Sequence, residues 1–114
     1  MKGGDNGDVI PSIDAASVPP DAYLLDVREQ DEWDAGHVDG SQHIPIGELL
    51  GRLNEVPADR EVIVVCRVGS RSAQVTAYLG QQGYDTVNLD GGLEAWVDAG
   101  RPLVTDTAAP PRVL

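Results

Sequence analysis

The stretch VIVVCRVGSRSAQ, residues 62–74, joins four β-branched residues to a cysteine, a glycine and two arginines. Four consecutive β-branched residues predict a strand that is buried on both faces of a parallel sheet. Apolar residues then recur at helical spacing over residues 75–79, which predicts a helix at about residues 70–82. Cys66 is therefore expected in a turn between the end of a buried strand and the start of a helix.

Short apolar runs and helical patterns alternate on both sides of this stretch. Strands are expected at residues 9–13, 23–27, 42–45, 61–65 and 86–89, and helices at residues 29–35, around residues 49–53, at residues 70–82 and after the Gly91-Gly92 pair. Strands that alternate with helices favour right-handed crossovers and a parallel sheet. The expected fold class is therefore α/β, with helices on both faces of the sheet.

The length of 114 residues suits a single domain, expected at residues 8–103. Residues 1–7, rich in glycine and charge, are expected to form a flexible N-terminus. Residues 104–114 contain small residues and two prolines and are expected to form a flexible C-terminal tail with little to bury. With one cysteine the chain forms no internal disulfide, which fits a free thiol in a reducing cytoplasm.

The chain is strongly acidic, with 8 lysines and arginines against 19 aspartates and glutamates and a formal net charge of −11. This balance argues against nucleic acid or an anionic membrane as a partner. No apolar run approaches the length of a membrane span, and the first seven residues lack the apolar stretch of a signal peptide. A cytoplasmic location is expected.

The surroundings of Cys66 favour a sulfur anion. Successive N–H groups in a glycine-containing turn can converge on one point, and the start of a helix adds partial positive charge. Both effects lower the pKa of a thiol, and the thiolate is the nucleophile. Arg67 and Arg71 can attract or hold an anionic substrate. The alternative is a buried, inert cysteine at the end of a strand.

The spacing from Cys66 to Arg71 separates two chemistries. Cysteine-dependent phosphatases carry Cys-x5-Arg, in which the arginine clamps phosphate, whereas this loop reads Cys-x4-Arg. A ring of N–H groups that is one residue shorter fits a single sulfur atom on the cysteine better than a whole phosphate group.

Three motifs, CRVGSRS, LLDVREQDEWDAGHVDGSQHIP and GYDTVNLDGGLEAW, resemble those of a single-domain rhodanese, a sulfurtransferase. The resemblance covers about residues 8–103. It implies a three-layer α/β sandwich with a five-stranded parallel sheet. It also implies that the cysteine takes a sulfane sulfur from a small anionic donor such as thiosulfate and passes it, as a persulfide, to a thiol, cyanide or protein acceptor. No cofactor or metal is expected.

By this resemblance Cys66 is the sulfur carrier and Ser72 lies just behind the loop. The cradle comprises Arg67, Val68, Gly69, Ser70 and Arg71. The loop departs from the thiosulfate and mercaptopyruvate signatures, which favour threonine where Arg71 stands, so the donor stays open. Two other functions remain: a non-catalytic rhodanese-like binding module, and a cysteine-dependent phosphatase or arsenate reductase.

Asp26, Arg28 and His37 also match the family's pattern and are expected to support the site. A structural ion pair is expected for Arg28, with a nearby acid such as Glu32. A lone histidine such as His37 could be a general base, but a hydrogen-bonded support for the loop is the preferred interpretation.

Both tryptophans, Trp33 and Trp96, are expected to pack in the core, with a place at the mouth of the pocket as the alternative for Trp33. The acidic run at residues 29–34 is expected to be a solvated face at the start of a helix rather than a metal site. Two scattered histidines and one cysteine give no zinc-ligand spacing.

Overall fold

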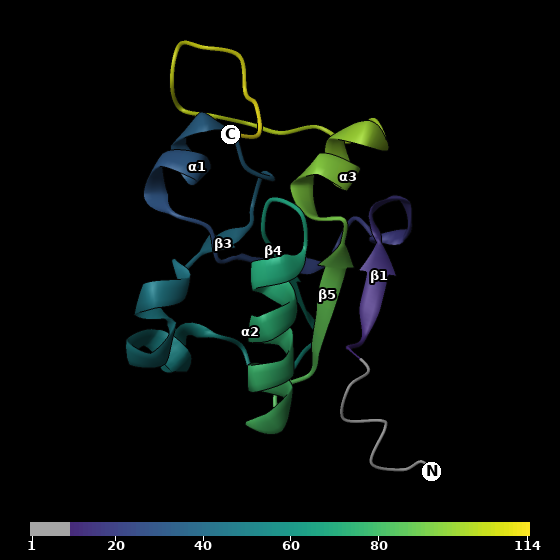
Figure 1. Ribbon diagram of the computed structural model, residues 1–114, viewed down its shortest axis with the longest axis vertical. Helices are drawn as coiled ribbons and strands as arrows, with labels where there is room; N and C mark the ends of the chain where they lie inside the picture. Colours follow the sequence, from purple (N-terminus) through teal and green to yellow (C-terminus); the bar gives the residue numbers. More distant parts are fainter. Residues whose placement is uncertain (1–9) are drawn as a thin grey trace.

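A computed structural model describes residues 10–114 and contains a five-stranded parallel sheet in the order β1-β5-β4-β2-β3 (Figure 1). The strands are β1 (Ser12–Asp14), β2 (Tyr23–Asp26), β3 (Gln42–His43), β4 (Val62–Val65) and β5 (Thr86–Asp90). The helical segments are η2 (Ala15–Ser17), α1 (Gln30–Ala35), η3 (Ile46–Glu55), α2 (Ser70–Gln81) and α3 (Gly92–Asp98).

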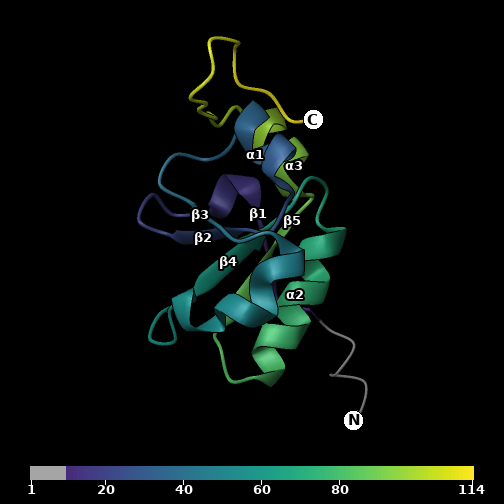
Figure 2. The same cartoon turned by 90° about the vertical axis from the view of Figure 1, so that its left-hand side faces the viewer.

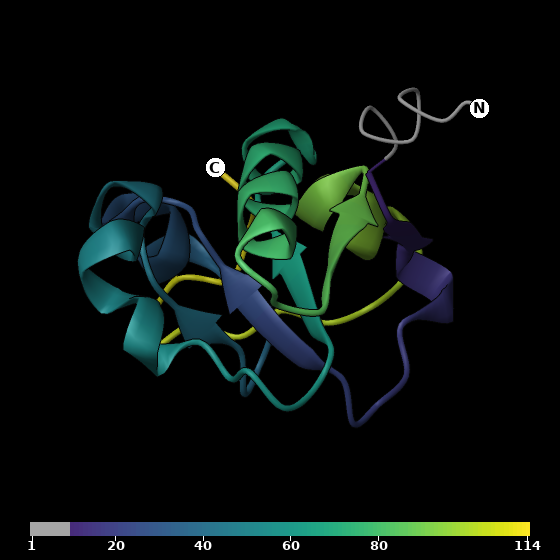
Figure 3. The ribbon, with the colours of Figure 1, turned by 90° about the horizontal axis from the view of Figure 1, so that it is seen from below.

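The side chains of β4 alternate between two hydrophobic cores. Val62, Val64 and Cys66 belong to a core with residues of η3 and α2, whereas Ile63 and Val65 belong to a core with residues of η2 and α3. Period-2 alternation in a fully buried strand requires apolar residues on both faces, which explains the continuous apolar run. Figure 3 shows η3 and α2 next to each other, as the shared core requires. The expected α/β fold with helices on both faces is confirmed.

The long helical segment after β3 differs from the expectation. The apolar spacing predicted a helix around residues 49–53, and the observed η3 is longer, is 3₁₀-helical and kinks at Arg52, whose φ is −129°. Gly47 and Gly51 lie inside the segment, and glycine destabilises an α-helix interior. The short turn η2 and the exact start of β1 were also not anticipated, and Val9 lies outside the described residues.

The C-terminal residues contact the domain. His37 and Val104 form an antiparallel bridge, and the Arg112 N–H donates to the Ala35 carbonyl at 2.9 Å. A Cβ added at Gly36 would lie 2.5 Å from the Arg112 carbonyl oxygen, so the two backbones pack closely. Within residues 104–114 no side chain is buried, as expected, so the segment meets the domain mainly through its backbone, and its flexibility stays a prediction. Residues 1–7 lie outside the described residues.

The elements that surround the loop after β4 gather at one end of the molecule. Figures 1 and 2 both place α1, α3 and the C-terminal segment at the end toward which β4 and β5 run. Ligands of open parallel sheets bind beyond this edge. No helix within residues 10–114 is long and apolar enough to cross a membrane.

Candidate active site

Cys66 follows β4 directly, and the chain turns through Arg67, Val68 and Gly69 into α2. Gly69 has a φ of +101°, a left-handed conformation that glycine adopts without a Cβ penalty. A Cβ added at Gly69 would also lie 3.3 Å from the backbone nitrogen of Gly91. The turn therefore requires glycine here for its conformation and for its packing.

Hydrogen-bond donors converge on the Cys66 sulfur. The Gly69 N–H donates at 3.1 Å, and the N–H and the hydroxyl oxygen of Ser72 each lie 3.3 Å from the sulfur. Burial raises the pKa of the Cys66 thiol, but hydrogen bonds from Ser72, Gly69 and Val68 outweigh it and hold this pKa below its ordinary value. The loop thus stabilises a thiolate on a residue that is 0% exposed.

The N–H groups at the start of α3 bond the backbone of the Cys66 loop and fix its orientation. The Leu93 N–H donates to the Cys66 carbonyl at 2.9 Å, and the Glu94 N–H donates to the Arg67 carbonyl at 3.1 Å. Gly92 makes this approach possible, since a Cβ added there would lie 2.5 Å from the carbonyl carbon and oxygen of Arg67. The carbonyls of Cys66 and Arg67 thus face α3, and the N–H groups that follow them in the loop are free to face the Cys66 sulfur, as that of Gly69 does.

Carboxylates hold both arginines of the loop. Arg71 donates two hydrogen bonds to Glu32 of α1, at 2.8 and 2.9 Å, and Arg67 donates one to Glu94 at 2.9 Å. The bonds from Arg71 lower the pKa of Glu32 to about 2. The arginines therefore flank the loop as ion pairs rather than as unpaired anion-binding groups. The expectation that the acidic run is a solvated face is wrong for Glu32.

A third ion pair lies at the end of β2. Arg28 and Asp26 are both fully buried, and the Arg28 side chain donates to both Asp26 carboxylate oxygens at 2.8 to 3.1 Å. It also donates to the carbonyls of Glu32 and Gly36. Arg28 does pair with a nearby acid, as expected, but this acid is Asp26 and not Glu32, whose carboxylate is bonded to Arg71. Asp26, two residues away, faces Arg28 at the same strand end.

Residues 12–99 of this chain match the sequence pattern of the rhodanese-like domain family. The chain belongs to the rhodanese-like family. A sulfurtransferase of Allochromatium vinosum is 42% identical over 85 residues, which cover 74% of this chain and 79% of that protein. The thiosulfate sulfurtransferase GlpE of Pseudomonas fluorescens is 38% identical over 76 residues, covering 66% of this chain and 70% of that protein. These relatives place the chain in a family of sulfurtransferases.

A solved structure supports the same assignment. The crystal structure of a rhodanese-related protein from Thermoplasma volcanium matches with a TM-score of 0.80 and 34% sequence identity, covering 84% of this chain and 99% of that one. The rhodanese-like fold inferred from the three sequence motifs is confirmed.

The two tryptophans of this rhodanese-like domain differ in burial. Trp96 is buried in the core, as expected. Trp33 is only partly buried and stacks on two imidazoles, with ring centroids 3.6 Å from His37 and 4.6 Å from His43. The core position expected for Trp33 is therefore wrong. His37 Nδ1 lies 2.8 Å from the Trp33 carbonyl, and His43 Nε2 lies 2.8 Å from the Arg28 carbonyl.

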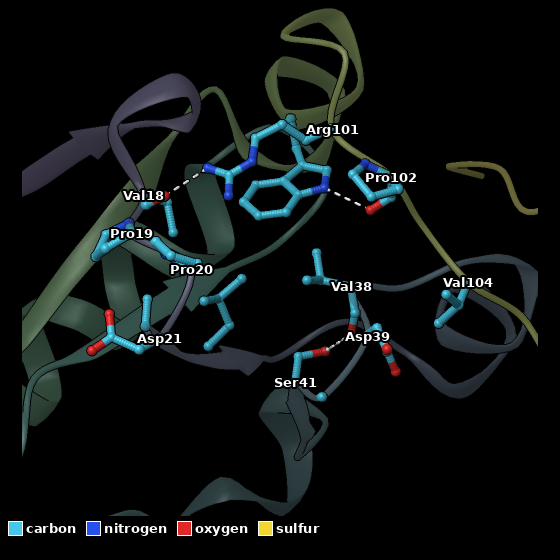
Figure 4. Close-up of a pocket in the computed structure, with 14 residues that line it drawn as sticks. Val18, Pro19, Pro20, Asp21, Val38, Asp39, Ser41, Arg101, Pro102 and Val104 are labelled. Atoms are coloured by element: carbon cyan, nitrogen blue, oxygen red, sulfur yellow. Dashed lines mark hydrogen bonds between the residues drawn. The ribbon is translucent and has the colours of Figure 1, made fainter.

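A cavity of about 490 Å³ lies on the η2 and α3 side of the rhodanese-like domain, away from the loop (Figure 4). Its walls include Pro19, Val38, Trp96 and Arg101. The Arg101 guanidinium stacks over Trp96 and donates to two backbone carbonyls at 2.8 Å. No residue of the Cys66 loop lines this cavity. Among the described residues, no group of three or more potential metal ligands forms a metal site.

The sequence interpretation missed two contributors to the site, Glu94 and Asn88. Glu94 pairs with Arg67, and Asn88 bonds both the loop and Ser72. Asn88 had a detectable signal, because it is a polar residue inside an otherwise apolar strand, where a buried side chain needs partners. Of the expected cradle residues, Val68 is 46% exposed and Ser70 is exposed at the start of α2.

Proposed function

We propose that this protein transfers a sulfane sulfur from a small anionic donor such as thiosulfate to a nucleophilic acceptor through a persulfide on Cys66. The convergence of donors from Gly69 and Ser72 on the Cys66 sulfur carries the proposal. A structural cysteine needs no stabilised thiolate, whereas a sulfur carrier does. A reducing compartment, the cytoplasm, keeps this single thiol free.

The reaction has two steps. The Cys66 thiolate attacks the outer sulfur of thiosulfate, a new S–S bond forms, and sulfite leaves with the electron pair of the bond that breaks. A thiol, cyanide or protein nucleophile then attacks the outer sulfur of the persulfide, and Cys66 leaves as a thiolate. The loop donors favour the thiolate that begins and ends this cycle.

The other loop residues receive roles by position. The N–H groups of Ser70 and Arg71 belong to the first turn of α2 and have no acceptor within the helix, so they suit the outer sulfur of the persulfide. Arg67 and Arg71 steer the donor, which competes with Glu94 and Glu32 for them. Because Cys66 is 0% exposed, the donor reaches its sulfur only after the residues around the loop rearrange.

Asp26, Arg28 and His37 are supporting residues in this proposal. The buried pair of Asp26 and Arg28 holds the end of β2 beside the loop, and the Val27 N–H donates to the Val65 carbonyl at 3.1 Å. His37 braces the segment after α1 through its backbone bridge to Val104. None of these contacts requires a proton transfer during the reaction.

Mass spectrometry of the intact protein after incubation with thiosulfate tests the proposal. The protein should gain one sulfur atom, cyanide should remove it, and protein alkylated at Cys66 beforehand should gain nothing. A binding module would gain no sulfur and would bind a partner without chemistry. A phosphatase would gain no sulfur and would hydrolyse an aryl phosphate, so either result would replace the present proposal.

A further inference from the structure

Asn88 of β5 connects two of the residues that donate to the Cys66 sulfur, Gly69 and Ser72. Its side-chain N–H donates to the Gly69 carbonyl at 3.2 Å, and its carbonyl oxygen lies 2.5 Å from the Ser72 hydroxyl oxygen. The bond to Gly69 fixes the orientation of the amide, since only its nitrogen can donate to a carbonyl. The amide oxygen therefore faces Ser72. Asn88 is 7% exposed, so water does not readily replace these bonds.

The Ser72 hydroxyl has one hydrogen and two acceptors within reach. One acceptor is the Cys66 sulfur at 3.3 Å, and the other is the Asn88 amide oxygen at 2.5 Å. A hydroxyl donates a single hydrogen bond. At any moment the hydroxyl hydrogen therefore points to one of these acceptors, and the other acceptor faces a lone pair of the Ser72 oxygen.

We propose that Asn88 is a positioning residue that competes with the Cys66 sulfur for the hydroxyl hydrogen of Ser72. A thiolate draws the hydrogen to the sulfur and leaves the Asn88 oxygen unpaired. When the sulfur bears a proton or an outer sulfur atom, it carries no charge, and the hydrogen returns to Asn88. Asn88 thus stabilises the states in which the Cys66 sulfur is uncharged.

This competition has a consequence for sulfur transfer, which rests on the proposed function. In the first step the Cys66 sulfur loses its charge and the Ser72 hydrogen moves to Asn88; in the second step both changes reverse. Without Asn88 the thiolate is more stable, a weaker nucleophile and a better leaving group. For a pKa change of one unit, the attack of the thiolate slows by about threefold.

The charged groups around the loop are common to all the variants that test this proposal. They are Arg67 of the loop, Arg71 of α2, Glu32 of α1, Glu94 of α3 and the Asp26–Arg28 pair after β2. Because none of them is altered, their effects on Cys66 cancel when pKa values are compared between variants.

The test is the rate of Cys66 alkylation against pH in four proteins: wild type, Asn88→Ala, Ser72→Ala and the double variant. Ser72→Ala should raise the Cys66 pKa, and Asn88→Ala should lower it by about one unit, the scale of one hydrogen bond to a charged group. In the Ser72→Ala background the Asn88 substitution should have no effect. This pattern is specific to competition through the hydroxyl.

Other patterns overturn the proposal. If Asn88→Ala raises the Cys66 pKa, or shifts it equally with and without the Ser72 hydroxyl, Asn88 acts only by supporting the Gly69 backbone. If Asn88→Ala does not fold, Asn88→Leu takes its place, because leucine fills the side-chain space and lacks the acceptor. It should then lower the Cys66 pKa as predicted for Asn88→Ala. Alkylation uses no sulfur donor, so this test stands even if the protein gains no sulfur from thiosulfate.

Thr86→Val is the matched control. Thr86 lies on the same strand and face, is buried, and donates from its hydroxyl to the Thr76 carbonyl of α2 at 2.9 Å. Its loss removes a buried hydrogen bond between β5 and α2 without touching the Ser72 hydroxyl. The Cys66 pKa should stay unchanged in this variant, and a shift equal to that of Asn88→Ala would contradict the proposal.

Discussion

The ends of β2 and β4 are neighbours in the sheet, yet their buried polar groups are arranged in opposite ways. After β2, the charge of Arg28 is paired with Asp26, and the remaining donors of Arg28 bond backbone carbonyls. After β4, several donors converge on one sulfur atom, whose charge changes with protonation. Among the described residues, no buried side-chain nitrogen or oxygen lacks a partner at either end.

This difference separates a structural site from a reactive one. A closed ion pair such as Asp26–Arg28 gains nothing from a change of charge, because either partner left alone would be buried and uncompensated. A sulfur surrounded by donors is stabilised as an anion and can still exchange its proton for an outer sulfur atom. We therefore expect substitutions after β2 to change stability, and substitutions after β4 to change reactivity.

Cys66→Ser should show the largest effect on reactivity. A serine hydroxyl forms no persulfide and is scarcely ionised near neutral pH, so transfer of sulfur to cyanide should be abolished. Stability should change by only about 1 kcal/mol, since serine is similar in size and keeps donors nearby. Thiocyanate production and urea unfolding measure the two effects. Residual transfer near the wild-type rate would refute Cys66 as the carrier.

Arg28→Ala should show the largest effect on stability. It leaves the Asp26 carboxylate buried without its partner, and breaking a buried pair in this way costs about 3–5 kcal/mol. The double variant Asp26→Ala/Arg28→Ala should lose less than the sum of the two single variants, because no charge is left behind. Urea unfolding of all four proteins gives the coupling free energy, and additive losses would mean that the pair is not a unit.

Local sequence patterns predicted the position of Cys66 well. The apolar run before it, the helical spacing after it and Gly69 act over a few residues, where strand and helix preferences are decisive. The kinked 3₁₀ segment η3 could not be predicted from its leucine spacing alone, because periods of 3.0 and 3.6 residues cannot be told apart over one or two turns.

The pairing of charges could not be predicted in the same way. Glu32 is four residues from Arg28, which made that pair plausible, but its carboxylate bonds Arg71, 39 residues away. Which of several arginines approaches a carboxylate depends on where α1 lies relative to the start of α2, and no periodicity encodes that. The partners of Asn88 could not be predicted for the same reason, since Gly69 and Ser72 come from another part of the chain.

Gly92→Ala tests whether the contact between α3 and the loop after β4 matters for reactivity. The added methyl group would overlap the backbone of Arg67 and push α3 away from the loop, and the φ of +62° adds strain. We expect a loss of about 2 kcal/mol in stability, from strain of about 1 kcal/mol and overlap of similar size, together with slower sulfur transfer.

Gly100→Ala is the control for this prediction. Gly100 has a φ of +80° at the end of α3, and a Cβ there would have no atom within 4 Å. It should show only the conformational strain of about 1 kcal/mol and unchanged sulfur transfer. Equal effects of Gly92→Ala and Gly100→Ala, measured by urea unfolding and thiocyanate production, would mean that contact between α3 and the loop does not matter.

Glu32→Gln tests the residue that joins the two regions, and its expected effect is the smallest. The Glu32 carbonyl accepts from Arg28, while its carboxylate accepts from Arg71. Its side chain also accepts from the Glu29 N–H in a capping box, a role that glutamine can keep. The substitution therefore removes the charge that faces Arg71 and preserves the start of α1.

The pH dependence gives the decisive measurement for Glu32. Its pKa is lowered from 4.5 to about 2 in the folded protein, so its ion pair stabilises the fold above pH 4.5, and this contribution is lost as the pH falls toward 2. Since the Arg71 side chain is 34% exposed, we expect only about 1–2 kcal/mol. The difference in unfolding free energy between wild type and Glu32→Gln should be fully present at neutral pH and vanish near pH 2.

Glu94→Gln, which breaks the more exposed pair with Arg67, should change stability by less than about 1 kcal/mol at any pH. In the Glu32→Gln protein the released Arg71 is also available to the donor, so kcat/KM for thiosulfate should rise. If the difference in unfolding free energy between wild type and Glu32→Gln persisted unchanged at pH 2, the charge on Glu32 would not be its source. Glu32 would then stabilise the protein only through α1 and its contact with Arg28, and not through Arg71.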